Sequence, residues 1–452
     1  MPFELSKDFI DEIKASIEDK DENTSIEILE SLHPADIAEI YDELSIDEAK
    51  FLYLLLDKEK AADTIAELDE DDRERFLKAL PSEVIAKQFI EKMDSDDAAD
   101  VIGDMDEEKQ EQVLSHIEDI EQAGDIVDLM AYDENSAGGL MAKELIRVNE
   151  NWTLTNCLRE MRKQAEEVDE VYYVYVVDDN DILGGTASLK KMLLSDNRKK
   201  VIEISNKDII SVKTDTPKDE VAGIMEKYDL VALPVTDSIG RLLGRITIDD
   251  VVDVIKEEAE KDYQMASGIS EDIESTDKIW LLTRARIPWL LIGLLGGILV
   301  ANVIGLYEID LGMYPEMAFF IPLIAAMGGN VGVQSSAIIV QGLANNSLGI
   351  ESTYKKLGRE FVVASINGVI LSVIIFIYNV FASDTYALTL TVSIALFSVI
   401  IFASFFGTLI PLALNKYKID PALATGPFIT TLNDIMGLFI YLMIGRILFA
   451  AL

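Results

Sequence analysis

Positive charge is scarce in this chain. Lysine and arginine total 39 against 81 aspartates and glutamates, which gives a formal net charge of −42 at pH 7. Such an excess of carboxylate excludes nucleic acid as a partner, because its phosphates would be repelled. It attracts cations instead, and clefts lined by one sign of charge concentrate them. A surface kept soluble by carboxylates alone would have the same composition.

Cysteine and histidine are almost absent. The single cysteine, Cys157, excludes an intrachain disulfide framework and fits a reducing compartment. His33 and His116, the only histidines, both precede the apolar half, so imidazole-based metal or proton chemistry is excluded there. Residues 1–20 are charged and lack an apolar core of signal-peptide length, which predicts a cytosolic N-terminus.

Charge of either sign is rare after residue 277. Residues 278–452 contain nine basic and eight acidic residues, so residues 1–277 carry the negative charge. Five stretches there are uncharged for about the 20 residues that a helix needs to cross the ~30 Å hydrocarbon core. We therefore predict a multi-pass protein of the cell (inner) membrane, with spans at about 287–307, 317–344, 361–383, 386–414 and 423–447.

Basic residues in the connections predict the orientation of these spans, because cytoplasmic loops retain lysine and arginine. Two basic residues precede the first span, three lie between the second and third, and two lie between the fourth and fifth. The alternate connections contain none, which places the N-terminal half in the cytoplasm and Leu452 outside. Arg446, near the outer end of the last span, departs from this pattern and is interpreted as a snorkelling or interfacial side chain.

The second predicted span is unusually polar. It contains Pro322 and then Gly328, Gly329, Asn330 and Gln334, which would be costly against lipid unless buried or facing water. We expect a helix that is broken or thinned at mid-membrane. Close helix packing through small residues is the alternative.

The fifth predicted span contains an aspartate, Asp434, at about its middle. An ionisable residue at the bilayer centre costs at least ~2.5 kcal/mol, so it marks an ion pathway or a proton relay by default. No lysine or arginine deep inside the spans could pair with it. A soluble cation is the natural partner, and a neutral, hydrogen-bonded aspartate is the alternative.

The first 130 residues contain three similar stretches, which begin at Ala35, Ala62 and Ala99. Each combines an Ala-Asp pair with apolar residues at helical spacing, and they follow one another at intervals of 27 and 37 residues. This predicts an irregular superhelix of stacked helices. Most of its carboxylates are expected to be ordinary solvated side chains.

A strand and helix pattern follows and is duplicated. The unit that begins at Ile146 recurs at Ile210, an offset of about 64 residues, and resembles a tandem pair of CBS modules. The turn with Thr247 and Asp249 resembles the ribose-contacting turn of adenosine-binding CBS modules. The first module has Leu189 in place of that aspartate, so a nucleotide such as ATP is expected at the second module only.

A helix with an acidic stripe precedes the first span. Asp250, Asp253, Glu257 and Glu260 follow one another at helical spacing, beside an apolar face of Ile248, Val251, Val252, Ile255 and Ala259. Like charges on one helix face repel, so a cation is expected between them unless the face is only solvated. Its place in the chain predicts a gating element.

Taken together, these motifs resemble the MgtE family of magnesium channels over essentially the whole chain. The carrying features are the run from Tyr132 to Gly138, the CBS pair, the acidic helix, the Pro322 to Gln334 run, Asp420-Pro421-Ala422 and Thr430 to Asp434. The resemblance implies a homodimer and a closed state locked by cytosolic Mg²⁺. The implied domains are a helical N domain (1–131), an α+β tandem CBS domain (132–256, divided at about 200), a connecting plug helix (248–275) and an all-α five-helix pore domain (283–452).

The same resemblance implies site residues. Asp434 would bind hydrated Mg²⁺ near backbone groups of Gly328, Asn330 and Gly437. The regulatory ions would be bound by carboxylates of the N domain, the CBS domain and the plug helix, among them Asp97, Asp100, Asp250, Asp253, Glu257 and Glu258. Asp94 and Asp96 lie in the same dense acidic run, so one sequence does not fix the register.

The chemistry of Mg²⁺ agrees with this interpretation. Mg²⁺ prefers oxygen ligands and keeps most of its waters, so one Asp434 carboxylate from each of two subunits would suit it. Without thiolate or imidazole ligands the spans do not favour Zn²⁺ or Cu⁺, although Mn²⁺ or Co²⁺ could pass.

Three other functions stay open. An ion-coupled carrier would use the same site, and a membrane-anchored nucleotide sensor would use its spans only as an anchor. An intramembrane enzyme is disfavoured, because Asp420 precedes Asp434 by about 20 Å of helix and cannot share a proton with it. The chain is therefore not expected to be an enzyme.

Overall fold

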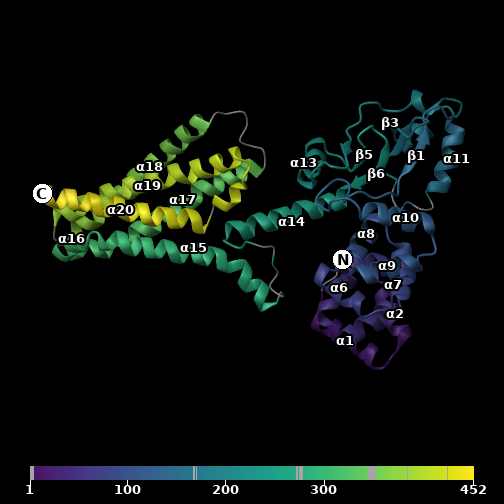
Figure 1. Cartoon of the computed structure of the whole chain (residues 1–452), viewed down its shortest axis with the longest axis horizontal. Helices are drawn as coiled ribbons and strands as arrows, with labels where there is room; N and C mark the ends of the chain where they lie inside the picture. Colours follow the sequence, from purple (N-terminus) through teal and green to yellow (C-terminus); the bar gives the residue numbers. More distant parts are fainter. Residues whose placement is uncertain are drawn as a thin grey trace. The chain divides into compact units, whose positions relative to one another are not determined.

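The structure is a computed structural model that describes residues 5–165, 168, 171–270, 273, 278–344, 353–383, 385–424 and 426–452. It divides into two compact units, Met1–Lys256 and Glu257–Leu452. The first unit contains short helices and two small sheets, and the second contains long helices (Figure 1).

Residues 5–130 form a series of helices, as predicted. The helices are α1 (Lys7–Glu18), α2 (Glu22–Glu30), α3 (Pro34–Glu39), α4 (Ile46–Tyr53), α5 (Lys58–Ala66), α6 (Glu70–Lys78), α7 (Ser82–Gln88), α8 (Ser95–Gly103), α9 (Glu107–His116) and α10 (Ile120–Leu129), with 3₁₀ turns η1 (Tyr41–Glu43) and η2 (Ile90–Lys92). Asp21, Asp57, Asp106 and Asp119 each accept a backbone N–H at a helix start. Part of the acidic excess therefore serves as helix caps.

Contacts between helices that lie three apart along the chain, α2 with α5 and α6 with α9, recur at a nearly constant sequence separation. The ammonium group of Lys60 donates to Leu29 O at 2.9 Å, and that of Lys109 donates to Leu77 O at 2.6 Å. These pairs are 31 and 32 residues apart, and the predicted intervals of 27 and 37 lie on either side of that separation. Each lysine satisfies carbonyl groups at a helix end that the helix itself leaves unpaired. The superhelical arrangement is thus held by long-range side-chain caps as well as by its apolar core.

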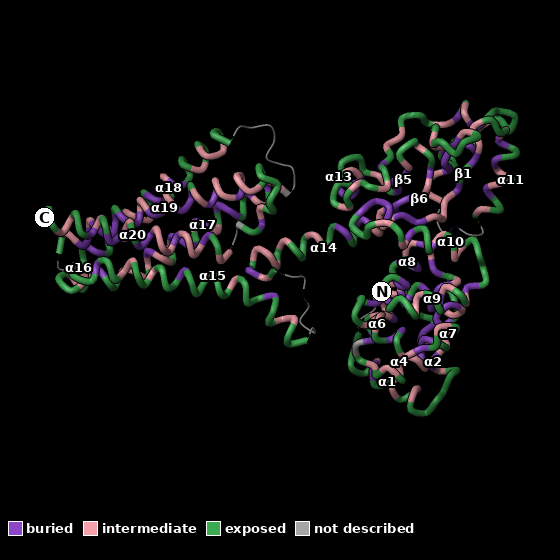
Figure 2. The backbone as a smooth tube through the Cα atoms, in the orientation of Figure 1, coloured by how far each residue is buried: buried purple, intermediate pink, exposed green. Residues whose placement is uncertain are grey.

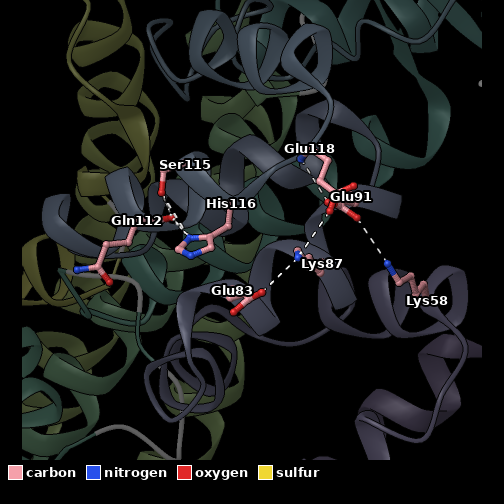
Figure 3. Close-up of polar contacts among 8 residues, drawn as sticks. All are labelled: Lys58, Glu83, Lys87, Glu91, Gln112, Ser115, His116 and Glu118. Atoms are coloured by element: carbon pink, nitrogen blue, oxygen red, sulfur yellow. Dashed lines mark hydrogen bonds and ion pairs between the residues drawn. The ribbon is translucent and has the colours of Figure 1, made fainter.

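The surface of this domain also has a chain of polar contacts (Figure 3). Glu91 accepts from Lys58 at 3.5 Å and from the backbone N–H of Glu118 at 3.3 Å, while Lys87 pairs with Glu83 at 3.2 Å. Nδ1 of His116 lies 2.6 Å from Gln112 O in its own helix. Exposed ion pairs contribute little individually, so this chain of contacts adds to the fit between helices without dominating stability.

Two sheets of the same topology follow, which confirms the duplication. The first is β1 (Ile146–Asn149), β2 (Val174–Val177) and β3 (Leu183–Ala187), and the second is β4 (Val212–Lys213), β5 (Ala232–Thr236) and β6 (Leu242–Thr247). In each sheet the second strand lies in the middle. It pairs in parallel with the first strand and antiparallel with the third. The associated helices are α11 (Leu154–Gln164), α12 (Leu189–Leu193) and α13 (Lys218–Tyr228), with the 3₁₀ turn η3 (Val201–Glu203).

The helix after the second sheet, α14 (Ile248–Ala266), differs from prediction in its buried face. Val251 and Val254 are its buried residues, whereas Val252 and Ile255 are 54% and 45% exposed. Ala259 is exposed as well. The predicted apolar face was therefore wrong in part, because only one turn of the helix packs on the CBS core. Of the predicted plug segment, residues 271, 272 and 274–275 lie outside the described residues.

Among the described residues, the second unit has five helices long and apolar enough to cross a membrane, as predicted. They are α15 (Ile279–Gly305), α17 (Ile321–Ala344), α18 (Thr353–Ala382), α19 (Tyr386–Lys416) and α20 (Pro427–Ala451). The short elements between them are α16 (Glu308–Met313), η4 (Pro315–Phe320) and η5 (Pro421–Ala424). Helix α19 is the most buried of the five, and α15 and α18 are mostly exposed (Figure 2).

The expectation of a broken second span was wrong. Helix α17 is continuous through Gly328, Gly329 and Asn330. The glycines instead allow close packing, which was the alternative. A Cβ added at Gly407 would lie 2.6 Å from Gly332 O, and one added at Gly332 would overlap the Asn433 carboxamide. Helix α17 therefore packs backbone to backbone against α19 and closely against α20.

Arg446 is not a free snorkelling side chain. Its guanidinium donates to Asp310 Oδ2 from Nε at 2.9 Å and from Nη2 at 2.6 Å, and its carbon Cζ lies 4.3 Å from the Tyr307 ring centroid. Asp310 belongs to α16, in the connection between the first two spans. The positive charge of Arg446, which departs from the distribution of basic residues among the connections, is thus neutralised by Asp310 of the same unit.

We predict that Gly407→Ala destabilises the protein by about 1–3 kcal/mol, because the added methyl group meets a backbone oxygen that cannot move aside. Gly358→Ala in α18 is the matched control, because a Cβ there meets nothing within 4 Å. It should be neutral or slightly stabilising. Thermal unfolding of both variants in detergent measures the difference, and equal unfolding temperatures would contradict the packing described.

Candidate cation sites

An acidic centre lies in the first unit, where α8 meets the CBS domain. Carboxylate oxygens of Asp94, Asp96 and Glu144 all lie within 4.8 Å of one another. Ser95 connects the two segments: its hydroxyl donates to Glu144 Oε2 at 2.7 Å and accepts from Lys143 N at 2.9 Å. Hydrogen bonds of Ser95 therefore hold Glu144 beside Asp94 and Asp96, although about 50 residues separate the two segments.

The first turn of α14 belongs to the same acidic centre. Asp250 Oδ2 accepts from Thr247 N at 3.0 Å and from Thr247 Oγ1 at 2.8 Å, so this carboxylate is fixed at the helix start. Burial raises the pKa of Asp250 to about 6 despite these hydrogen bonds. Burial, then the charges of Asp97 and Asp250, raise the pKa of Asp96 well above its ordinary value.

Asp97 and Asp100 lie one turn apart on α8 and complete the acidic centre. Burial and the Asp250 carboxylate raise the pKa of Asp97, and burial raises that of Asp100 against the opposing effect of Arg73. Both side chains are still open to solvent, so water screens part of the repulsion. That openness also gives an ion a path to them.

Counter-charge near the acidic centre is limited. Arg73 donates to Asp104 Oδ2 from Nη2 at 2.6 Å and from Nε at 2.9 Å, so its guanidinium is committed to that carboxylate. Carboxylate oxygens are the ligands that Mg²⁺ and Ca²⁺ prefer in proteins. The donor set of the acidic centre therefore fits a hard divalent cation.

The sequence predicted Asp97, Asp100 and Asp250, and the structure brings these three together. Asp253 lies one turn further along α14, where its charge raises the pKa of Asp250 and, after burial, is the largest cause that raises the pKa of Glu67. The sequence did not identify Glu144 or Glu67, because a contact across about 50 or more residues leaves no periodic signal.

A second group of carboxylates surrounds the membrane end of α14, within the second unit. Burial raises the pKa of Asp262, and so do the charges of Asp420 and Glu258. Glu258 was predicted and Asp262 was not, although it follows Glu258 at helical spacing. Glu257 and Glu260 are exposed.

The end of α14 also contacts the segment before α20. A Cβ added at Gly268 would lie 2.6 Å from Pro427 Cγ, and one added at Gly426 would overlap Ala266 O. Because α20 carries Asp434, the helix with the acidic stripe touches the start of the helix with the membrane carboxylate.

Asp434 is half-buried in α20. It lies seven residues after Pro427, about 10 Å along the helix. The predicted position at mid-span is therefore wrong for the helix itself, because Gly426 with φ +53° ends the preceding turn and delays the start of α20. Among the described residues, no basic side chain forms an ion pair with it.

The glycines predicted beside Asp434 do lie together. Cβ atoms added at Gly328 and Gly437 would lie 3.1 Å and 3.3 Å from Val399 Cγ1, and the former would be 3.7 Å from Asn433 O. Asn330 lies on the exposed side of α17, as does Gln334. The structure thus separates a packed glycine face of α17 from an open amide face.

The predicted nucleotide residues lie at the junction of β6 and α14. Thr247 is buried and its hydroxyl is bonded to Asp250, whereas Asp249 is exposed in the first turn of α14. At the matching position of the first module, α12 begins with Leu189. Only the second module therefore presents a carboxylate there.

Comparison with known proteins decides the family. The magnesium transporter MgtE of Thermus thermophilus is 32% identical over 445 residues, which cover 97% of this chain and 98% of that protein. The chain belongs to the MgtE family. The MgtE of Bacillus subtilis is 33% identical over 69% of each chain. The family models match residues 32–135 as the MgtE intracellular N domain, 137–194 and 201–257 as CBS domains, and 321–444 as MgtE, a divalent cation transporter.

Solved structures resemble the cytosolic unit. The cytosolic domain of the Mg²⁺ channel MgtE in complex with ATP is 34% identical, with a TM-score of 0.52, and covers 54% of this chain and 99% of that one. The soluble part of a magnesium transporter is 29% identical, with a TM-score of 0.50, and covers 55% and 98%. The MgtE fold of the cytosolic region is thereby established.

We predict that divalent-cation binding at the acidic centre is weakened by acid. A carboxyl whose pKa is raised on folding binds more protons in the folded state. Without divalent cations, its contribution to stability is therefore present at low pH and is lost between the ordinary value of 3.8 and the raised value, about 6 for Asp250. Mg²⁺ should protect the cytosolic unit of the full protein from proteolysis at pH 7.5 and much less at pH 5.

The control for this measurement is a variant in which Asp94 and Asp96 become Asn and Glu144 becomes Gln. It should show little Mg²⁺ protection at either pH. Protection of the unmodified protein that is as strong at pH 5 as at pH 7.5 would contradict the prediction.

Proposed function

We propose that this chain is a Mg²⁺-selective channel for Mg²⁺ uptake, which works as a homodimer and closes when cytosolic Mg²⁺ binds to its carboxylates. The observation that carries the proposal is Asp434, a half-buried carboxylate beside tightly packed glycines in a membrane-spanning helix. Full-length similarity to proteins named magnesium transporter MgtE supports the choice of ion.

The selectivity proposal rests on hydration. Mg²⁺ dehydrates reluctantly, so it is best bound by one or two carboxylates that leave most of its waters in place. Two copies of Asp434 around a two-fold axis would provide such a site. The exposed amides of Asn330 and Gln334 on α17 would then hydrogen-bond the hydrated ion or its water file.

Apolar residues on the CBS domain support a homodimer. Leu193 and Leu194 at the end of α12 are 67% and 79% exposed, and Val252 and Ile255 on α14 are also open. A second copy of the chain would cover them. Burial of these side chains at a subunit interface would add hydrophobic stabilisation.

The gating proposal follows from repulsion at the acidic centre. Without cations, the carboxylates of α8, of Glu144 and of Asp250 repel one another and favour separation of the N and CBS domains. Mg²⁺ between them would favour the compact form by its difference in affinity. Helix α14 would transmit that change, because its far end contacts the start of α20.

ATP is proposed as a ligand of the second CBS module. Asp249 is exposed at the start of α14 and Thr247 lies next to it, as the resemblance to adenosine-binding modules implied. The related cytosolic domain described in complex with ATP supports this proposal. ATP would then bind within three residues of Asp250, at the same start of α14.

The cell membrane location has a proposed orientation. With five spans and the first unit in the cytoplasm, the chain ends outside, so Leu452 would lie on the outer face. The Arg446 and Asp310 pair would then lie near the outer surface.

We predict that Asp434→Ala abolishes selective Mg²⁺ uptake into liposomes while the protein stays assembled, because the substitution removes the carboxylate on which the ion depends. The matched control is Glu308→Gln, an exposed acid in the outer connection of the same unit, and it should conduct normally. Unchanged Mg²⁺ selectivity in the Asp434 variant would refute the assignment of the ion site.

We also predict that neutralising Asp97, Asp100 and Asp250 as Asn raises the cytosolic Mg²⁺ needed for closure by at least about tenfold, a loss of about 1.4 kcal/mol of coupling. Conversion of Glu12, Glu27 and Glu111 to Gln removes three exposed charges outside the acidic centre and serves as control. Closure of both variants at the same Mg²⁺ concentration would mean that the acidic centre does not gate.

A further inference from the structure

A carboxylate in the membrane unit, Glu360, is held by hydroxyl groups from two other helices. Glu360 lies near the start of α18 and is half-buried. Its Oε1 accepts from Ser335 Oγ of α17 at 2.7 Å and from Ser404 Oγ of α19 at 2.6 Å. The two hydroxyl oxygens are 3.1 Å apart. One carboxylate oxygen thus joins three membrane helices.

The geometry makes Glu360 the hub of this group. A serine hydroxyl has one hydrogen, whereas an ionised carboxylate only accepts. Both serines are almost fully buried, at 4% and 1% exposure, so neither can turn to bulk water for a partner. Removal of the acceptor would leave the two buried hydroxyls to pair with each other or with carbonyl groups of their own helices, and their link to α18 would be lost.

The hub lies next to a close backbone contact between α17 and α19. Ser335 follows Gly332 by three residues, and Ser404 precedes Gly407 by three, so each serine is about one turn from a glycine. A Cβ added at Gly407 would meet Gly332 O at 2.6 Å and Ser335 Cβ at 3.1 Å. The hydrogen bonds to Glu360 therefore join α17 to α19 at the level where their backbones touch.

The turn of α17 that contains Gly332 also contacts α20, next to the proposed ion site at Asp434. Asn433, the neighbour of Asp434, packs against Gly332. The carboxamide of Asn433 is 1% exposed, and neither of its polar atoms has a hydrogen-bond partner among the described residues. Since packing alone holds it, the orientation of this part of α20 depends on where Gly332 lies.

We propose that Glu360 is a positioning residue for the ion site: its hydrogen bonds to Ser335 and Ser404 fix α17 against α19, and Gly332 then fixes Asn433 and the adjacent Asp434. This inference rests on the proposed role of Asp434. It assigns to Glu360 no contact with the ion. The requirement is a hydrogen-bond acceptor at Oε1, which a glutamine carbonyl also provides.

The test compares Glu360→Gln with Glu360→Ala in reconstituted full-length protein, with Mg²⁺ flux measured alone and in competition with Mn²⁺ or Co²⁺. Glu360→Ala should reduce the preference for Mg²⁺ by about five- to tenfold, a typical coupling between distant residues. Glu360→Gln should retain most of it. Ser335→Ala with Ser404→Ala should match Glu360→Ala, and all three changes together should add little more, because they break one network.

Ser398→Ala is the control, because that hydroxyl on α19 donates only to Ile394 O in its own helix. It should leave selectivity unchanged. An equal loss in Glu360→Gln and Glu360→Ala would show that the charge itself is needed, and unchanged selectivity with a lowered unfolding temperature would reduce Glu360 to a structural role. Either result overturns the proposal. Retained selectivity in Asp434→Ala would instead refute the proposed function, whatever Glu360 does.

Discussion

A carboxylate that leaves bulk water needs a cation or several hydrogen-bond donors, and this chain provides cations sparingly. Where acids are caps, as Asp57 and Asp119 are, backbone N–H groups satisfy them. Glu360 is satisfied by two hydroxyls. At the acidic centre and at Asp434, protein cations and hydrogen-bond donors together do not balance the carboxylates. A mobile cation would balance the remaining charge. The proposed transport and gating both follow from that deficit.

The deficit also explains how the ion could control its own passage. In the proposed mechanism the same ion chemistry would act at two places on one continuous path of chain. Asp250 lies at the start of α14, and the end of α14 packs on Gly426 and Pro427 at the start of α20. A change at one end of a rigid helix can bias the other only if two discrete arrangements exist. Repulsion between carboxylates without Mg²⁺, and bridging with it, would supply two such arrangements.

Most of the architecture could be predicted from the sequence, because its signals are local. Apolar runs gave the five spans, and the recurrence of the strand pattern gave the paired modules. The run of glycines in α17 misled, since a glycine run is equally compatible with a break and with close packing. The continuity of α17 and its close contacts with Gly407 and Asn433 decide between these two.

The site residues were harder to predict, for physical reasons. Aspartate is both a helix cap and a metal ligand, so its frequency in the N domain does not identify a site. Glu144 joins Asp94 and Asp96 only through folding, as Ser95 shows by bridging the two segments. Glu360 looks like an ordinary interfacial acid at the end of an apolar run until its two serine partners are seen.

The central claim is that the membrane unit conducts Mg²⁺ as a pore which the cytosolic carboxylates close. Single-channel recording from the reconstituted protein, with Mg²⁺ as the permeant cation and its concentration varied on the side of the N-terminal unit, tests it most directly. The account predicts unitary currents whose open probability falls as Mg²⁺ on that side rises. Mg²⁺ transport without unitary currents would indicate a carrier, and unitary currents indifferent to Mg²⁺ on that side would contradict the gating account.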